Sequence, residues 1–226
     1  MNLEVSNSRP TLLIISGWAH GLETIRPLGH TLSDQFDIQL ITGAQVLKDQ
    51  AIPDVDYIIA GSMGGLLSLE LLPEASKKLI LISSTAKFCT GEGYPCGTPE
   101  KIIKRMILQL KKNPRAVLTE FYKNVHFPAP PLTPTPKTDL DSLVKGLEYL
   151  LHSDVRKKVP EIKIPVLLMH GENDRIIPPQ ATEWLHRNLP KSQIKIFRNA
   201  GHALPAHQFA EIIADIRSFL SFETGC

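Results

Sequence analysis

Short apolar runs alternate with stretches of helical spacing over the first 85 residues of the chain and again after residue 159. Six runs have the length and the Ile, Leu and Val content of strands: 11–16, 38–41, 57–60, 79–82, 166–170 and 193–197. Continuous apolar strands separated by helices are typical of parallel sheets buried on both faces. The helices are expected at 22–33, 63–72, 178–189 and 204–219. We therefore predict an α/β fold, a mostly parallel sheet with helices on both faces.

Residues 85–158 interrupt this alternation. They contain no convincing strand, and helices are expected instead at 99–112, 114–125 and 138–152. The simplest architecture is a core of residues 1–84 and 159–226 with an inserted helical lid of residues 85–158. The proline-rich stretch PAPPLTPTP, at 128–136, is either a stiff loop of this lid or a polyproline docking peptide.

The composition narrows the classes of partner and compartment. A net charge of +2 is too close to neutral to favour nucleic-acid binding. No run approaches the ~18 apolar residues of a membrane helix, and the polar N-terminal segment lacks the pattern of a signal peptide. Cys89, Cys96 and Cys226 have neither metal-site nor disulfide-framework spacing. We expect a monomeric, cytoplasmic protein with no membrane segment and no metal or organic cofactor.

The segment IIAGSMGGLL, residues 58–67, places Ser62 directly after a predicted strand. A serine hydroxyl is a weak nucleophile, so it needs a general base and a carboxylate that orients the base. Asp174 and His202 follow two later predicted strands. Since the carboxyl ends of parallel strands meet at one edge of the sheet, we predict that Ser62, Asp174 and His202 form a catalytic triad. Their order along the chain is that of the α/β-hydrolases.

Small residues surround Ser62, as a sharp turn from strand to helix requires. Ala60 lies two residues before it, and Gly64 lies two residues after it. We predict that the backbone N–H of Met63 stabilises an oxyanion, helped by the helix dipole. A second donor is expected from the backbone N–H of Trp18 in the loop SGWAHG, with the indole forming a wall of the pocket.

Each assignment has a purely structural alternative. Trp18 could fill the core, alone or while serving the site, and Asp174 could cap the helix near Pro178. Three further histidines lie near the proposed site and are interpreted as packing or loop residues: His20, His170 and His207. The joint occurrence of three residue types, in order and each after a strand, favours the triad.

The lid carries a concentration of positive charge. Residues 98–123 hold seven Lys and Arg against two Glu, a local charge of +5. On a helix, one side would carry the charges of Lys101, Lys104, Arg105, Lys111 and Lys112. The other side would largely carry the apolar residues Ile102, Ile103, Met106, Ile107 and Leu110. This strip is either a solvated face or a docking surface for an acidic partner or anionic substrate.

Several segments resemble the pimeloyl-[acyl-carrier protein] methyl ester esterases of biotin synthesis, which are α/β-hydrolases with a helical lid. They are SGWAHGLETIRPL, LILISSTAKF, GLEYLLHSDVRKKVPEIKIPVLLMHGENDRIIPP and AGHALPAHQFAEI. The resemblance implies a serine carboxylesterase that hydrolyses the methyl ester of a pimeloyl chain on acyl carrier protein. It assigns the nucleophile, acid and base to Ser62, Asp174 and His202, and the oxyanion donors to Trp18 and Met63.

The resemblance also implies that the acidic carrier protein binds basic lid residues, of which Arg115 matches one family position. The residues expected to bind substrate or carrier are Trp18, Phe88, Lys101, Lys104, Arg105, Arg115 and Phe121. The sequence departs from the family at Ser16, usually histidine, and at Thr119, usually basic. QLITGAQVLKDQAIPDVDY replaces the usual D-x-P-G-x-G loop. This change predicts a trimmed helix and a more open pocket on that side.

Two other functions stay open at this stage. A general short-chain carboxylesterase, a thioesterase or a C–C bond hydrolase of the same fold would use the same triad. A non-catalytic binding protein could use the hydrolase pocket as a receptor, although it would have no need of Ser62, Asp174 and His202 together.

Overall fold

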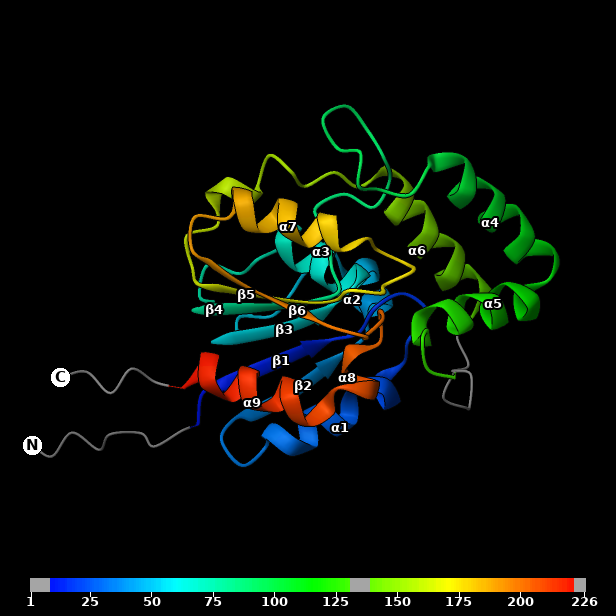
Figure 1. The fold of residues 1–226 in the computed structure, drawn as a ribbon. Helices are drawn as coiled ribbons and strands as arrows, with labels where there is room; N and C mark the ends of the chain where they lie inside the picture. The colour runs from blue at the N-terminus through cyan, green and yellow to red at the C-terminus, as the bar shows by residue number, and fades with distance from the viewer. Residues whose placement is uncertain (1–8, 131–138, 222–226) are drawn as a thin grey trace, which may run out of the picture.

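The computed structural model describes residues 9–130 and 139–221 of the chain. Within them, one six-stranded sheet has the order β2-β1-β3-β4-β5-β6, and all neighbouring strands are parallel (Figure 1). The strands are β1 (Thr11–Ile15), β2 (Asp37–Ile41), β3 (Tyr57–Gly61), β4 (Lys78–Ile82), β5 (Val166–Gly171) and β6 (Ser192–Phe197). The predicted parallel α/β fold is therefore confirmed. Residues 131–136 of the proline-rich stretch and Cys226 lie outside the described residues.

Helices cover both faces of this sheet. The bounds are α1 (Leu22–Leu32), α2 (Gly43–Asp49), α3 (Met63–Glu70), α4 (Glu100–Lys112), α5 (Pro114–His126), α6 (Leu140–His152), α7 (Pro179–Asn188), α8 (Leu204–His207) and α9 (Phe209–Leu220). A 3₁₀ turn (Val159–Glu161) precedes β5. Helices α1 and α9 pack on one face of the sheet, and α3 and α7 pack on the other (Figure 1).

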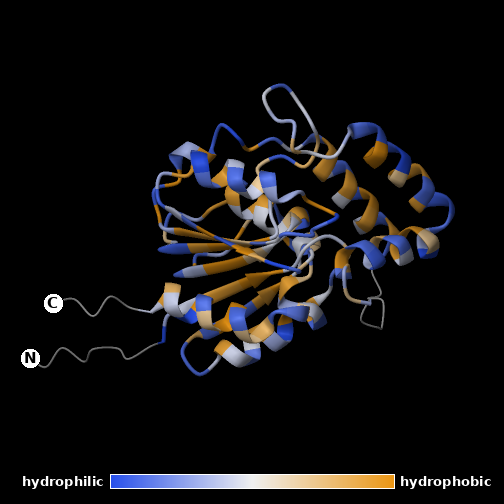
Figure 2. Cartoon of the chain, viewed as in Figure 1, coloured by the Kyte–Doolittle hydropathy of each residue, from blue (hydrophilic) through white to orange (hydrophobic). Residues whose placement is uncertain are grey.

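The four central strands, β1, β3, β4 and β5, are buried on both sides, which explains their continuous apolar sequences, whereas the edge strands β2 and β6 are only partly buried. Within β1, Leu13 and Ile15 face the core shared with α3 and α7, whereas Leu12 and Ile14 face the core shared with α1 and α9. Figure 2 shows the same layering, with orange strands between helices whose blue sides face outward.

The segment between β4 and β5 carries α4, α5 and α6, which lie beyond the carboxyl ends of the strands (Figure 1). Their apolar residues, among them Ile103, Leu110 and Leu147, extend the core of the α3 side. We call this segment the insert. Among the described residues, no helix is long and apolar enough to cross a membrane.

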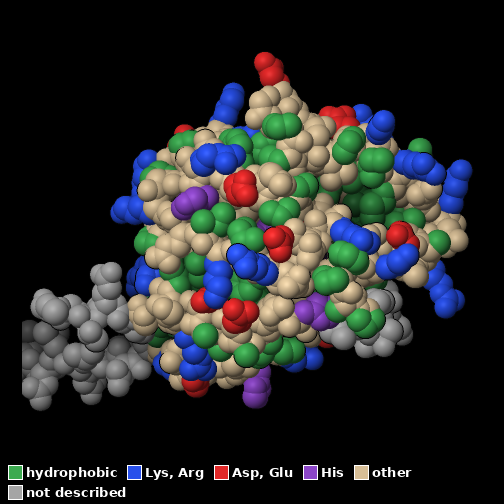
Figure 3. Space-filling view, viewed as in Figure 1, with side chains coloured by type: hydrophobic (Ala, Val, Ile, Leu, Met, Phe, Trp, Pro, Cys, Tyr) green, Lys and Arg blue, Asp and Glu red, His purple; other side chains and the backbone are tan. Residues whose placement is uncertain are grey.

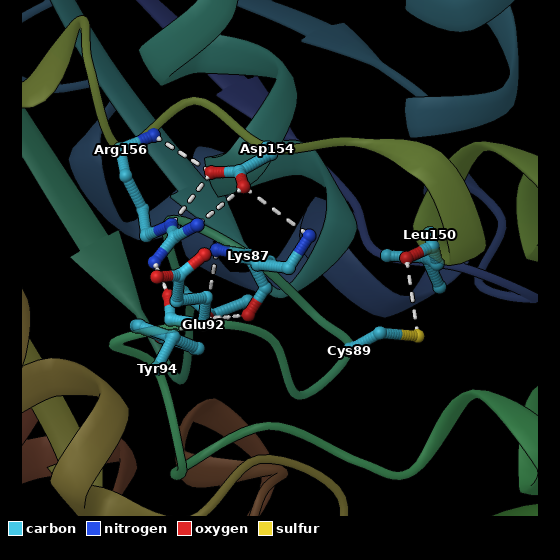
Figure 4. A network of polar contacts seen from close by, with 8 residues as sticks. Lys87, Cys89, Glu92, Tyr94, Leu150, Asp154 and Arg156 are labelled. Carbon is cyan, nitrogen blue, oxygen red and sulfur yellow. Dashed lines mark hydrogen bonds and ion pairs between the residues drawn. The ribbon is translucent and has the colours of Figure 1, made fainter.

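The two ends of the insert meet where it joins the sheet (Figure 4). The Asp154 carboxylate lies 3.2 Å from Lys87 Nζ and accepts two 2.8 Å hydrogen bonds from the Arg156 guanidinium. Arg156 also donates to the carbonyl of Glu92, and the N–H of Val155 donates to the carbonyl of Ala86. These contacts, the base of the insert, tie the chain entering it to the chain leaving it.

Three details differ from the sequence predictions. The helix expected at 204–219 is broken at Gln208, so α8 and α9 are separate. Ile102, expected on the apolar side of α4, is 48% exposed. It lies about 100° around the helix from Ile103, which shares the buried stripe with Ile107 and Leu110. The trimmed helix expected between residues 39 and 57 was given no bounds from the sequence; it is α2, whose N-cap Thr42 accepts from the N–H of Gln45.

Candidate active site

Ser62 occupies the turn between β3 and α3 with φ 52° and ψ −121°, a conformation that L-residues rarely adopt. Its N–H donates to the carbonyl of Ile82 on β4 at 2.9 Å. Its carbonyl accepts from the N–H groups of Gly65 and Leu66 in the first turn of α3. Such strain costs about 1–3 kcal/mol and persists only where the surroundings fix the backbone. Sheet pairing before Ser62 and the helix after it fix it here.

The loop after β1 passes directly beside this turn. A Cβ at Gly17 would lie 3.0 Å from the Ser62 Cβ and 3.5 Å from its Oγ. A Cβ at Gly64 would lie 2.6 Å from the carbonyl oxygen of Ser16. Glycine at position 64 therefore allows α3 to approach the loop, as the small-residue pattern around Ser62 predicts.

Asp174 and His202 are in direct contact. His202 Nδ1 lies 2.6 Å from Asp174 Oδ2, and their side chains are 5% and 0% exposed. The other carboxylate oxygen accepts from the N–H groups of Ile176 and Ile177. These bonds cap the turn that follows Asp174, and its other oxygen bonds the histidine. The predicted alternative, a cap of the helix near Pro178, is not realised, because α7 begins after Pro178 with no side-chain cap bond. Burial alone would raise the pKa of Asp174, but His202 and His170 hold it well below its usual range.

His170, interpreted from sequence as a packing residue, joins this network from β5. Its fully buried ring places Nε2 3.0 Å from Asp174 Oδ2 and 2.8 Å from the carbonyl oxygen of Ile177. A proton on Nε2 leaves Nδ1 to accept from the Thr182 hydroxyl, 2.6 Å away. His170 therefore orients the candidate acid. The signal in the sequence was a histidine ending an otherwise apolar strand, since a buried imidazole needs polar partners.

Ser83 and Ser84, which follow β4, connect the two halves of the site. Ser83 Oγ donates to the carbonyl of His202, and Ser84 Oγ donates to the carbonyl of Ser62, each at 2.9 Å. Sequence analysis did not single out either serine, since hydroxyl residues after a strand are common. Their bonds place the segments that carry Ser62 and His202 around the same carboxyl end of β4.

Trp18 both fills the core and borders the site. The residue is 4% exposed, its indole N–H donates to the carbonyl of Leu143 on α6 at 2.8 Å, and its ring meets Phe121 of α5 edge-on at 4.7 Å. The loop that would supply an oxyanion donor is thereby attached to the insert. Met63 opens α3, so its N–H belongs to the first helical turn, whose donors have no partner within the helix.

A cavity of about 760 Å³ opens beside the loop after β1. The loop contributes Gly17 and His20, α2 contributes Lys48, and α6 contributes Lys145 to its lining. Helix α2, which borders this cavity, has only seven residues. The more open pocket expected on this side stays a prediction. Desolvation lowers the pKa of His20 to about 4, although the hydrogen bond to the Trp18 carbonyl opposes the shift.

The remaining predicted binding residues lie elsewhere. Four are exposed on the outer helices and do not line this cavity: Lys101, Lys104, Arg105 and Arg115. Lys104 pairs with Glu100 of the same helix at 2.8 Å. Phe88 is 8% exposed within the core of the insert. Within residues 9–130 and 139–221, no group of three His, Cys, Asp or Glu side chains could hold a metal ion.

Comparisons with known proteins agree with this geometry. Residues 37–209 match the family model described as "Serine aminopeptidase, S33". The chain is 26% identical to a pimeloyl-[acyl-carrier protein] methyl ester esterase of Nitrosomonas europaea, over 90% of this chain and 92% of the relative. A protein of the same name from Pseudoalteromonas atlantica is 24% identical, over 87% of this chain and 88% of the relative.

The fold is also found among solved structures. An esterase from Exiguobacterium antarcticum superposes with a TM-score of 0.80 at 18% identity, over 94% of this chain and 92% of that chain. The family match covers most of the chain, and the Ser62 turn and the Asp174–His202 pair lie at the strand ends where this fold carries its catalytic groups. The chain therefore belongs to the serine aminopeptidase S33 family, and it is a serine hydrolase of the α/β-hydrolase fold.

Proposed function

We propose that this enzyme is a serine carboxylesterase that removes the methyl ester from a pimeloyl chain carried on acyl carrier protein. Ester hydrolysis rests on one observation above all: Ser62 sits on a strained turn at the sheet edge where His202 is bonded to Asp174. The substrate is supported by the relatives that match about nine-tenths of the chain, which are named pimeloyl-[acyl-carrier protein] methyl ester esterases.

In this mechanism His202 takes the proton of Ser62, and the Ser62 oxygen attacks the ester carbonyl. The N–H groups of Met63 and Trp18 hold the oxyanion, methanol leaves, and water then hydrolyses the acyl-enzyme. Asp174, whose pKa is held low, keeps its charge and stabilises the imidazolium. Among the described hydrogen bonds none joins Ser62 Oγ to His202, so this bond has to form as the ester binds.

The partner assignment rests on charge. Lys and Arg side chains gather on the side of the molecule formed by α4 and α5 (Figure 3). This positive strip consists of the exposed residues Lys101, Lys104, Arg105, Lys111, Lys112 and Arg115. A carrier protein of opposite charge would be steered toward the insert. A small neutral ester would gain nothing from the strip.

The test compares two substrates across charge reversals. Lys104→Glu and Arg115→Glu should each lower kcat/KM for methyl pimeloyl-carrier protein by roughly 10-fold, while kcat/KM for p-nitrophenyl butyrate stays within about twofold. Lys191→Glu is the matched control. This exposed lysine precedes β6, at the amino ends of the strands, whereas the insert lies beyond their carboxyl ends. Equal losses on both substrates, or none, would contradict the carrier-protein substrate and favour a general esterase.

A second test measures growth of a bacterial strain without added biotin. The wild-type gene should restore biotin-independent growth to a strain that lacks its own esterase, and Ser62→Ala should not. Full rescue by Ser62→Ala would show that hydrolysis by this residue is not the biological activity, as a non-catalytic binding protein would require.

A further inference from the structure

The end of α5 rests on the segment that carries His202. The N–H of Ala203 donates to the carbonyl of Val125 at 3.0 Å. A Cβ at Gly201 would lie 1.7 Å from the carbonyl oxygen of Phe127, so no other residue fits there without displacing the backbone. The insert therefore touches the residues on both sides of the candidate base.

An imidazole pair fastens this junction. His126, in the last turn of α5, and His207, the last residue of α8, place Nδ1 and Nε2 3.0 Å apart. Their rings meet edge-on, with centroids 5.2 Å apart at 87°. His126 is 7% exposed, and His207 is partly buried. Neutral imidazoles satisfy this contact, because one ring nitrogen donates and the other accepts.

His202 is thus held from two directions. Its carbonyl accepts from Ser83 Oγ on the sheet side, at 2.9 Å, and from the N–H of Leu204, at 3.0 Å. Leu204 begins α8, and α8 ends at His207. The bond between His126 and His207 therefore fixes the short helix that immediately follows the base, whereas the Asp174 carboxylate fixes only its ring.

We propose that His126 and His207 are positioning residues for His202, so that the insert sets the geometry of the base as well as covering the site. This inference rests on the catalytic role of His202 proposed above. The bond from α5 holds α8 and the His202 backbone in the position from which the ring reaches Ser62. Loss of the bond shifts the base without removing it, and a displacement of about 1 Å at a reacting group can lower the rate 10²-fold.

The titratable and charged groups around the pair are His20 from the loop after β1, His202 itself, and Arg175, which stacks on Phe127. Burial lowers the pKa values of both His126 and His207, which keeps the pair neutral near pH 7. Once both rings are protonated, both facing nitrogens are donors and the bond breaks.

The contact geometry supplies conservative variants. An asparagine amide can take the place of Nδ1, and a glutamine amide can take the place of Nε2, so His126→Asn and His207→Gln preserve the bond without the titration. His126→Leu and His207→Leu remove it. His152→Leu, an exposed histidine at the end of α6, is the matched control. The measurements are kcat and KM for p-nitrophenyl butyrate, the pH profile of kcat/KM, and Tm.

We expect each leucine variant to lower kcat about 10-fold with KM within about twofold, because the base is misplaced and the substrate site is intact. The double variant His126→Asn/His207→Gln should retain kcat within about threefold. On the acid side, kcat/KM of the wild type should fall more steeply with decreasing pH than kcat/KM of the double variant, because only the wild type loses the bond when the pair is protonated.

Unchanged kcat in the leucine variants, or equal losses in the amide variants, would overturn the proposal. If His126→Leu does not fold, His207→Leu tests the same contact from the less buried side. Ser62→Ala and His202→Ala separate this outcome from the proposed function: if they retain activity, the catalytic assignment fails, whatever the histidine pair does.

Discussion

Ser62 carries a conformational strain that the proposed nucleophile role would explain. Its φ of 52° suits glycine, yet the chain places a serine there and holds it with bonds from β4 and α3. Strain of this kind concentrates at catalytic residues, where it presents a side chain to the substrate. A substitution at this position that relieves the strain should therefore raise stability and lower activity.

Ser62→Gly should abolish ester hydrolysis and raise the free energy of unfolding by about 1 kcal/mol, because glycine adopts positive φ without strain. Urea unfolding and a p-nitrophenyl ester assay measure the two effects. Ser62→Ala is the control, since it removes the hydroxyl but retains the strain and should leave stability nearly unchanged. A destabilised glycine variant would show that the turn is not strained.

The second residue-scale prediction concerns His20, whose pKa falls from 6.5 to about 4 in the folded chain. The unfolded state then binds more protons than the folded state between these values, so stability decreases as pH falls from 6.5 toward 4. The loss reaches roughly 2–3 kcal/mol for this group. His20→Asn retains a donor for the Trp18 carbonyl and should flatten the stability curve over that window in chemical unfolding.

The exposed His152 supplies the comparison for that experiment. His152→Asn should leave the slope of stability with pH unchanged. If His20→Asn and His152→Asn have the same slope as the wild type, the acid sensitivity comes from other groups.

At the scale of elements, the base of the insert joins the two chain segments that connect α4, α5 and α6 to the sheet (Figure 4). Asp154 joins Lys87 on the entering chain to Arg156 on the leaving chain. Hydrogen bonds from Arg156 and Lys87 lower the pKa of Asp154 to about 2, against the effect of burial. The Asp154 carboxylate therefore stays charged at neutral and mildly acidic pH.

Asp154→Asn should lower the free energy of unfolding by about 1 kcal/mol, because Lys87, which is only 14% exposed, loses its charged partner. The loss is not larger because Asp154 is 33% exposed, and water screens part of the interaction. Hydrogen exchange in α4–α6 should accelerate. The wild-type contribution is present above pH 3.8 and is lost as the pH falls toward 2, since the folded pKa is depressed.

An exposed pair on the insert provides the control. Asp141→Asn breaks the ion pair with Lys145. The side chains of Asp141 and Lys145 are 73% and 65% exposed, so the free energy of unfolding should stay nearly unchanged. Exchange in α4–α6 that is equal in both variants would mean that the base of the insert is not what holds it.

At the scale of the whole molecule, charge is distributed unevenly. The chain carries +2, but residues 98–123 carry +5, so the remainder is acidic. Residues 98–123 would therefore attract an acidic macromolecule more strongly than the rest of the chain, and steering by such a field is screened over a Debye length of about 8–10 Å.

Raising the salt concentration from 50 to 300 mM should lower kcat/KM for the carrier-bound ester several-fold, through KM, and leave a neutral p-nitrophenyl ester nearly unaffected. Stopped-flow or initial-rate assays on both substrates measure the ratio. The same salt response on both substrates would indicate that salt acts on the enzyme itself and not on its association with the carrier protein.

The sequence by itself determined where the strands and most helices lie, and the order in which the candidate catalytic residues follow the strands. Continuous apolar runs specify strands buried on both faces, and these appear within about two residues of their predicted bounds. Small residues around Ser62 specify a sharp turn, and Asp174 and His202 each follow a strand. These signals are local, because periodicity and turn chemistry depend on neighbours along the chain.

Packing between distant segments was decided only by the tertiary structure. Nothing local distinguishes the His126 that bonds His207 across 81 positions from other histidines. The apolar strand before His170 indicates a buried imidazole that needs partners, but it does not identify Asp174 as one of them. The break at Gln208 and the exposure of Ile102 likewise depend on what each helix packs against. A hydrogen bond between remote residues exists only once the sheet and the insert have brought them together, and no pattern along the chain encodes that distance.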